Sequence, residues 1–196
     1  MTEGFLANIS EEEISQSLDL LYNGDYEIIE RCLLRISNAP ELFEGTSAIA
    51  LNEITIQKAN LSMITINVYV DGAYLNTYWA DGLIVATPTG STAYSLSCTG
   101  PILTPQAENF VITPIASHNL TVRPIVIPDK SVIKIRTEGR GAECYVGLDS
   151  RTENVDNFID LIVRKEDFTI NLLQMSNKNF FKTIREKLNW GLDVRN

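Results

Sequence analysis

Apolar and polar residues alternate along much of this chain, which is the pattern of half-buried β-strands. The clearest run spans residues 63–70, where the apolar residues that share one face are Ile64, Ile66, Val68 and Val70. Asp71-Gly72 follows directly, and Asp-Gly after such a run predicts a two-residue hairpin turn. The return strand is therefore expected from Tyr74 to Trp79.

Other short runs repeat this pattern with turn signals between them. They cover residues 48–56, 83–87, 110–115, 124–127, 132–136, 142–148, 158–163 and 168–173. Many short strands with short connections favour a β-sandwich over a doubly wound parallel sheet. The expected fold class is therefore mainly β, with a few short helices.

Three segments predict helices. Ser10 followed three residues later by Glu13 is a capping box, and the helix that it opens is expected to stop at Asn23-Gly24-Asp25. A short helical piece is expected after Gly90. In the tail, helical spacing gives one apolar face made of Phe180, Phe181, Ile184 and Leu188. We expect a domain over residues 1–176 and a helical tail over residues 177–196.

Composition narrows the function classes. A net charge of −9 and a pI of about 4.6, with no basic stripe, argue against a nucleic-acid partner. The apolar runs are far shorter than the roughly 20 residues that span a bilayer, and no signal peptide is evident, so we expect a cytoplasmic protein. Three scattered cysteines and one histidine match no metal-ligand spacing, so no metal site is expected on this chain.

The segment Asp81 to Ser97 carries the strongest chemical signal. An apolar strand ends at Thr87, a Pro-Thr-Gly turn follows, and small hydroxyl residues open a helix. Such a junction can bind phosphate or ribose oxygens, and Tyr94 offers a ring for a base to stack on. Hydroxyl residues also cap ordinary helices, so the residues alone leave a purely structural role equally open.

A second signal is Asn52-Glu53 inside an otherwise apolar strand. Adjacent strand side chains point to opposite faces, so one of the two must face inward or line a cleft. The alternative is an edge strand whose polar pair is simply solvated. Spacing alone allows both interpretations.

Together these segments resemble the NAD kinase family. The resemblance is carried by Asn52-Glu53, by the run from Asp81 through Ser97 with its Thr-Pro-Thr-Gly-Ser-Thr-Ala-Tyr string, and by Gly100-Pro101. It extends from Phe5 to Asp193 and implies the β-sandwich of the family's carboxy-terminal domain. Where many members carry Asp-Gly-Gln, this chain has Asp149-Ser150-Arg151, so no contact is carried over to Ser150 or Arg151.

The resemblance also implies roles for single residues. Asn52 would contact the diphosphate and adenine side of a dinucleotide, and Glu53 would hold hydroxyls. Around the adenine, the implied contacts are Thr89, Thr92, Ala93, Tyr94 and Ser97. Asp81 and Ala116 would reach a nucleotide bound mainly by a neighbouring subunit, so a homo-oligomer, a dimer or tetramer, is expected.

The family's reaction sets the expected activity. It phosphorylates NAD to NADP at the adenosine ribose 2′-hydroxyl, with ATP and Mg²⁺. The family's catalytic aspartate lies in a Gly-Gly-Asp-Gly loop, and this sequence contains no Gly-Gly pair; Thr2 to Leu6 resembles the junction just after that domain. We therefore expect no catalytic residue here, and we expect a chain that binds the dinucleotide but is inactive alone. The alternative is a non-catalytic dinucleotide-binding or assembly module.

Overall fold

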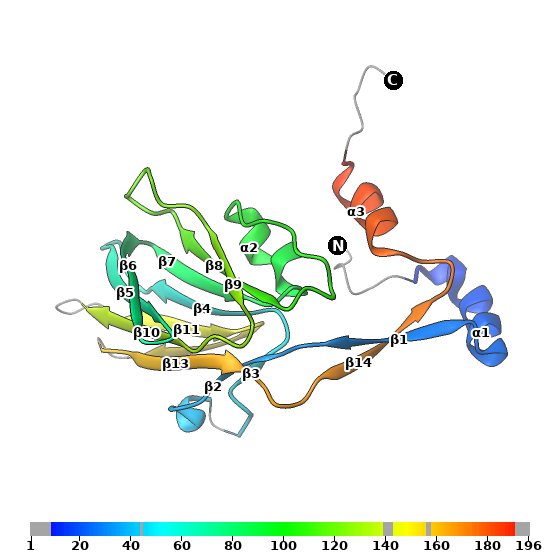
Figure 1. Ribbon diagram of the computed structural model, residues 1–196, viewed down its shortest axis with the longest axis horizontal. Coiled ribbons are helices and arrows are strands. Elements are labelled where there is room, and N and C mark those ends of the chain that lie inside the picture. The colour runs from blue at the N-terminus through cyan, green and yellow to red at the C-terminus, as the bar shows by residue number, and fades with distance from the viewer. Residues whose placement is uncertain (1–8, 44, 139–142, 156–157, 191–196) are drawn as a thin grey trace, which may run out of the picture. The chain divides into compact units, whose positions relative to one another are not determined.

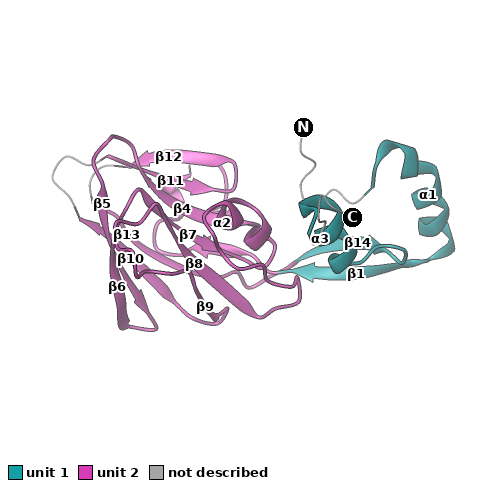
Figure 2. Cartoon of the chain, turned by 90° about the horizontal axis from the view of Figure 1, so that it is seen from above, with its two compact units in different colours: residues 1–31, 170–196 teal, residues 32–169 magenta. Residues whose placement is uncertain are grey.

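The structure is a computed structural model that describes residues 9–43, 45–138, 143–155 and 158–190. The chain forms two compact units, coloured separately in Figure 2: residues 32–169, and residues 1–31 together with 170–196. The expected junction at Thr2 to Leu6 and the last residues of the resemblance lie outside the described residues.

The larger unit is built from two six-stranded antiparallel sheets (Figure 1). The first has the order β3 (Ile49–Ala50), β2 (Leu34–Ile36), β13 (Asp160–Lys165), β10 (Ile133–Glu138), β5 (Ile64–Val70) and β6 (Ala73–Ala80). The second has the order β12 (Arg151–Val155), β11 (Cys144–Leu148), β4 (Glu53–Lys58), β7 (Gly82–Ala86), β8 (Asn109–Ile115) and β9 (Ile125–Pro128). A mainly β fold of antiparallel sheets confirms the predicted class.

Side-chain alternation buries one face of each sheet in a shared core. On β5, Ile64, Ile66 and Val68 are fully buried, as the period-two pattern requires. The opposite sheet contributes large buried side chains to the same cluster, among them Ile54, Ile56, Leu83, Phe110, Ile112 and Leu148. Burying each such side chain is worth roughly 1.5–3 kcal/mol, so this core holds the unit together.

The predicted hairpin is confirmed. β5 pairs with β6 across Asp71 and Gly72, whose φ angles of 51° and 81° are both left-handed. A two-residue turn of this kind needs positive φ at both positions, which Gly and Asp tolerate best. The Asp71 carboxylate also accepts the backbone N–H of Val132 at 2.8 Å.

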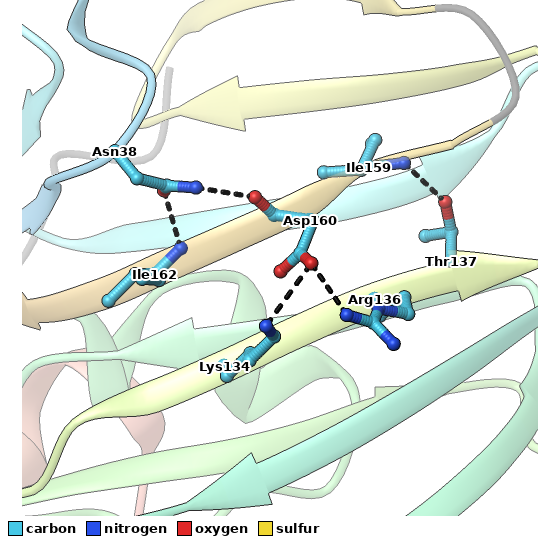
Figure 3. Close-up of polar contacts among 7 residues, drawn as sticks. All are labelled: Asn38, Lys134, Arg136, Thr137, Ile159, Asp160 and Ile162. Atoms are coloured by element: carbon cyan, nitrogen blue, oxygen red, sulfur yellow. Dashed lines mark hydrogen bonds and ion pairs between the residues drawn. The ribbon is translucent and has the colours of Figure 1, made fainter. Parts of the chain in front are cut away.

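Polar contacts link β13 to β10 and to the chain after β2 (Figure 3). Asp160 of β13 forms ion pairs with Arg136 at 2.8 Å and Lys134 at 3.2 Å, both from β10. Beyond the end of β2, the Asn38 amide donates to Asp160 O at 2.6 Å and accepts from Ile162 N at 2.7 Å. One side chain thereby replaces a missing strand neighbour and satisfies the β13 backbone there.

The smaller unit contains β1 (Tyr26–Arg31) paired antiparallel with β14 (Ile170–Met175), and two helices. The first, α1 (Ile14–Asn23), follows a short 3₁₀ helix η1 (Glu11–Glu13), with Ser10 N donating to the Glu13 carboxylate at 3.0 Å as the capping box predicts. It ends at Gly24, whose φ is 77°. The second is the predicted tail helix, α3 (Phe180–Leu188).

These units do not follow the boundary expected at residue 176. β14 pairs with β1 in a separate ribbon and not with the sandwich. The carboxy-terminal segment of the smaller unit therefore starts at Ile170. No local pattern predicts that residues 26–31 pair with residues 170–175, because the two segments are far apart along the chain. Short strands β2 and β12 were not predicted, and the strand expected over residues 48–56 is two strands, β3 and β4, separated by Leu51-Asn52.

Candidate functional site

The strand–turn–helix at the end of β7 is held by its own hydroxyl groups. The chain passes from Thr87 through η3 (Gly90–Thr92) into α2 (Tyr94–Ser97), which packs beside β7 (Figure 1). Thr87 Oγ1 donates to Leu51 O at 2.6 Å and accepts from Gly90 N at 3.1 Å. Both Thr87 and Ser91 are completely buried, so the structural interpretation holds for these two hydroxyls.

Ser91 and Thr92 fasten the turn in the same way. Ser91 Oγ donates to Pro88 O at 2.6 Å and accepts from Leu103 N at 2.9 Å, and Thr92 Oγ1 donates to Thr89 O at 3.1 Å. The expected ligand contacts Thr89, Thr92, Ala93 and Tyr94 are half-buried, and Ser97 is exposed. The turn is therefore rigid, and several expected contact residues remain accessible on it.

The two polar motifs meet at Asn52. Its backbone carbonyl accepts from Thr87 N at 2.9 Å. Gly90 packs so closely that a Cβ atom there would lie 2.0 Å from Asn52 O. Only glycine permits this approach, so the Pro-Thr-Gly turn fixes Asn52 against the junction.

Asp149 holds the same segment from the other side. Its carboxylate accepts the backbone N–H groups of Leu51 at 2.8 Å, Asn52 at 2.7 Å and Glu53 at 3.1 Å. Asp149 N returns a bond to Glu53 O at 3.1 Å, and the residue has a left-handed φ of 55°. The Asp149 carboxylate thus fixes the backbone conformation of the Asn52-Glu53 segment.

Glu53 is buried on an interior strand, so the solvated edge-strand interpretation of this position is wrong. β4 lies between β11 and β7, and Glu53 is 8% exposed. Within the described residues, its Oε2 atom is buried without a hydrogen-bond partner. Burial, and then the Asp149 charge, raise the pKa of Glu53 from 4.5 to about 7, and a backbone hydrogen bond from Tyr94 lowers it in part.

Tyr94 and Cys98 share the electrostatic environment of Glu53. Burial, followed by Cys98, Asp81 and Glu53, raises the pKa of the Tyr94 phenol. Burial and then Glu53 raise the pKa of the Cys98 thiol. The structure thus brings Glu53, Asp81 and Tyr94 together and adds Cys98, which sequence reasoning missed because a lone thiol one position past the motif carries no signal.

Asp81 and Ala116 are adjacent at the start of β7. Asp81 N donates to Ile115 O at 3.0 Å, and its carboxylate pairs with Lys58 Nζ at 2.6 Å. Ala116 is exposed and has a left-handed φ of 45°. Asp81 therefore lies beside Ile115, the residue before Ala116, and it also interacts electrostatically with Tyr94.

Arg151 has a structural role that the sequence did not indicate. Its guanidinium donates to Ser47 O at 2.8 Å, to Thr46 Oγ1 at 3.2 Å and to Ile49 O. It also lies 5.8 Å from the Phe43 ring centroid. Arg151 therefore holds the loop between β2 and β3, away from the Asn52 segment.

That loop borders a pocket of about 360 Å³ lined by residues such as Arg35, Ser37, Pro40, Thr46, Ile49 and Glu166. None of its lining residues belongs to the two polar motifs. The pocket is therefore separate from the segment where the two motifs meet.

Neither a metal site nor a membrane span is evident in the described part of the chain. No group of three or more His, Cys, Asp or Glu side chains there could hold a metal ion. No helix in the same residues is long and apolar enough to cross a bilayer.

Comparisons with known proteins place this geometry in context. The family model for the ATP-NAD kinase C-terminal domain matches residues 51–172. The NAD kinases of Cytophaga hutchinsonii and Flavobacterium psychrophilum are 51% and 50% identical over 194 and 195 residues. Each alignment covers 98% of this chain and 66% of the relative, so the chain spans about two thirds of the length of these curated relatives.

Solved structures share the fold. A yeast NADH kinase complexed with NADH superposes with a TM-score of 0.83 at 24% identity, covering 98% of this chain and 57% of that one. An NAD kinase from Archaeoglobus fulgidus in complex with ATP gives a TM-score of 0.78 at 26% identity, covering 93% and 70%. At 24% identity, the similarity to the yeast enzyme shows a shared fold and nothing more.

Proposed function

The chain belongs to the NAD kinase family, and from that membership we propose that it supplies the dinucleotide-binding half of an enzyme that phosphorylates NAD at the adenosine ribose 2′-hydroxyl with ATP. The observation that carries the proposal is the meeting of the two family motifs at Asn52. Gly90 and Thr87 from one side and Asp149 from the other hold that residue in place. Preorganisation of this kind lowers the cost of ordering a site when a ligand binds.

The proposed contacts with the dinucleotide are those that the family resemblance assigns to these residues. Asn52 and Glu53 face the diphosphate and ribose, and Tyr94 stacks near the adenine. The remaining adenine contacts are Thr89, Thr92, Ala93 and Ser97. In a homo-oligomer, Asp81 and Ala116 reach the nucleotide of a neighbouring subunit.

The phosphoryl-transfer machinery lies elsewhere in this proposal. Phosphoryl transfer depends on positioning and on neutralising phosphate charge, and Mg²⁺ arrives with ATP rather than as a resident ion of these residues. The two carboxylates nearest the motifs are already engaged, Asp149 with three N–H groups and Asp81 with Lys58. Neither of these two is free to act as the general base, and Glu53 is assigned here to ligand binding, so we expect the chain alone to be inactive.

The smaller unit offers the surface for the rest of the enzyme. Large apolar side chains are exposed on its helices, on its ribbon and just after α3: Tyr22, Ile28, Leu173, Phe181 and Trp190. Exposed apolar patches mark interaction sites. In the proposed enzyme, the tail over residues 177–196 packs on the domain by which the relatives are longer.

A coupled assay for NADP⁺ formation tests the function, with Mg-ATP and NAD⁺ in excess. The chain alone is expected to give no turnover. The chain joined to the amino-terminal domain of the Cytophaga hutchinsonii relative is expected to turn over in the usual enzyme range, from about 1 s⁻¹ upward. If the joined protein binds NAD⁺ and forms no NADP⁺ while the intact relative is active in the same assay, the non-catalytic binding module is the better account.

A further inference from the structure

Glu53 and Asp149 place two carboxyl groups beside one short segment, and the donors there serve only one of them. Asp149 accepts three backbone N–H groups at 2.7 to 3.1 Å. Such bonds stabilise a carboxylate in its charged form. These three donors are therefore taken up by Asp149.

Glu53 has the opposite environment. It is 8% exposed, and its Oε2 atom has no hydrogen-bond partner in the described part of the chain. A second charge here would be buried and would be repelled by Asp149, which favours the neutral acid. The pKa of Glu53 accordingly rises to about 7, so the group titrates at neutral pH.

The other titratable groups around Glu53 reinforce this. Tyr94 and Cys98, from α2 and the residue after it, both interact electrostatically with Glu53, and their own pKa values are raised. Both are therefore neutral near pH 7. Asp81, which approaches Tyr94, is paired with Lys58. These neighbours supply no positive charge that would keep Glu53 ionised.

We propose that Glu53 takes up a proton when the anionic diphosphate of a dinucleotide binds beside it, and that Asp149 fixes this proton on Glu53. The inference rests on the proposed function, because it assumes that NAD⁺ binds at Asn52 and Glu53. A dinucleotide diphosphate brings negative charge and excludes water, and both effects favour the neutral carboxylic acid. Glu53 then presents an O–H group to a ligand oxygen in place of a repelling charge.

Proton linkage gives this proposal a measurable sign. Above pH 7 free Glu53 is mostly ionised, so binding must draw a proton from solution, and the uptake should approach one proton per NAD⁺ near pH 8. Affinity for NAD⁺ should fall by up to about tenfold per pH unit above pH 7. Below about pH 6 the group is already protonated, so the uptake and the pH dependence should both disappear.

Calorimetric titration of NAD⁺ into the full chain at pH 7.5, in two buffers of different ionisation enthalpy, counts the protons directly. We expect uptake of about half a proton or more in the wild type. We expect none in Glu53→Gln, which mimics the protonated acid, so its affinity for NAD⁺ should not change with pH between 6 and 8.5. Tyr94→Phe and Cys98→Ser should retain the uptake, as should the distant exposed control Glu153→Gln.

Several results overturn the inference. NAD⁺ binding without buffer dependence in the wild type would contradict it alone, as would uptake that persists in Glu53→Gln. Absence of any NAD⁺ binding would contradict the proposed function and the inference together. If Glu53→Gln fails to fold, carboxyl-carbon NMR of the wild type decides: a Glu53 midpoint near pH 7 that rises with NAD⁺ supports the inference, and one near 4.5 refutes it.

Discussion

The Glu53 carboxyl affects stability as well as binding. Its pKa is about 7 in the folded chain and near 4.5 otherwise. As pH rises from about 4.5, the unfolded chain releases this proton first, so the free energy of unfolding falls until pH passes 7. Ionisation of Glu53 therefore makes the fold less stable at high pH than at low pH.

Glu53→Gln removes this cost. We expect the variant to be more stable than the wild type by about 2–3 kcal/mol near pH 8, since each unit of pKa shift corresponds to about 1.4 kcal/mol. The advantage should vanish near pH 4.5. Urea unfolding at both pH values measures it, with exposed Glu153→Gln as the matched control. Equal stability of Glu53→Gln and wild type at pH 8 would show that Glu53 is not a buried acid.

Single residues also show where sequence reasoning stopped. The string around Tyr94 and the Asn52-Glu53 pair stood out from their residue types, but only the family resemblance assigned them to a binding site. Asp149 and Arg151 could not be assigned, because their roles consist of bonds to backbone groups about 100 positions away. Side chains that bind backbone leave no pattern in the sequence around their targets.

Among the elements, those defined by local signals were predicted and those defined by distant pairing were not. The Asp71-Gly72 hairpin and the α1 capping box depend on neighbouring residues, and both are confirmed. The ribbon of β1 and β14 was not predicted, because these two strands pair across more than half the chain. The break between β3 and β4 lies where the N–H groups of Leu51, Asn52 and Glu53 donate to Asp149 and not to a neighbouring strand. The sequence around residues 51–53 does not predict these three bonds, because Asp149 is distant along the chain.

The contact between the β7–α2 turn and the Asn52 segment can be tested by adding one methyl group. In Gly90→Ala, the Cβ atom would lie 2.0 Å from Asn52 O and 2.4 Å from Asn52 C, so backbone must move. We expect a loss of roughly 1–3 kcal/mol in stability and a drop in NAD⁺ affinity of at least tenfold. Thermal unfolding and calorimetry measure the two effects, with exposed Thr104→Ala as control. Unchanged affinity in a folded Gly90→Ala chain would separate the turn from the site.

At the scale of the whole molecule, the sandwich has exposed aromatic residues on an edge strand. β6 ends the first sheet, and its Tyr74 and Trp79 are 58% and 53% exposed. An unprotected edge strand is a surface for pairing with another chain. Together with the shared role proposed for Asp81 and Ala116, this predicts a homo-oligomer with closed symmetry.

Light scattering across a range of protein concentrations tests that assembly. We expect a dimer or tetramer, and we expect Trp79→Lys to shift it toward smaller species. Thr77→Lys on the same strand is expected to shift the assembly in the same direction. A monomer at all concentrations that binds NAD⁺ at full strength would contradict a shared site.

Calorimetric titration of NAD⁺ tests whether the dinucleotide binds where the Asn52 segment meets the β7–α2 turn. We expect binding to the wild type and a loss of roughly 1–3 kcal/mol of affinity in Tyr94→Ala, because a stacked base loses its ring. Asn52→Ala should cost a comparable amount, because a ligand polar group loses its partner, and exposed Arg123→Ala should cost nothing. Full-strength NAD⁺ binding by folded Tyr94→Ala and Asn52→Ala chains would instead place the dinucleotide elsewhere.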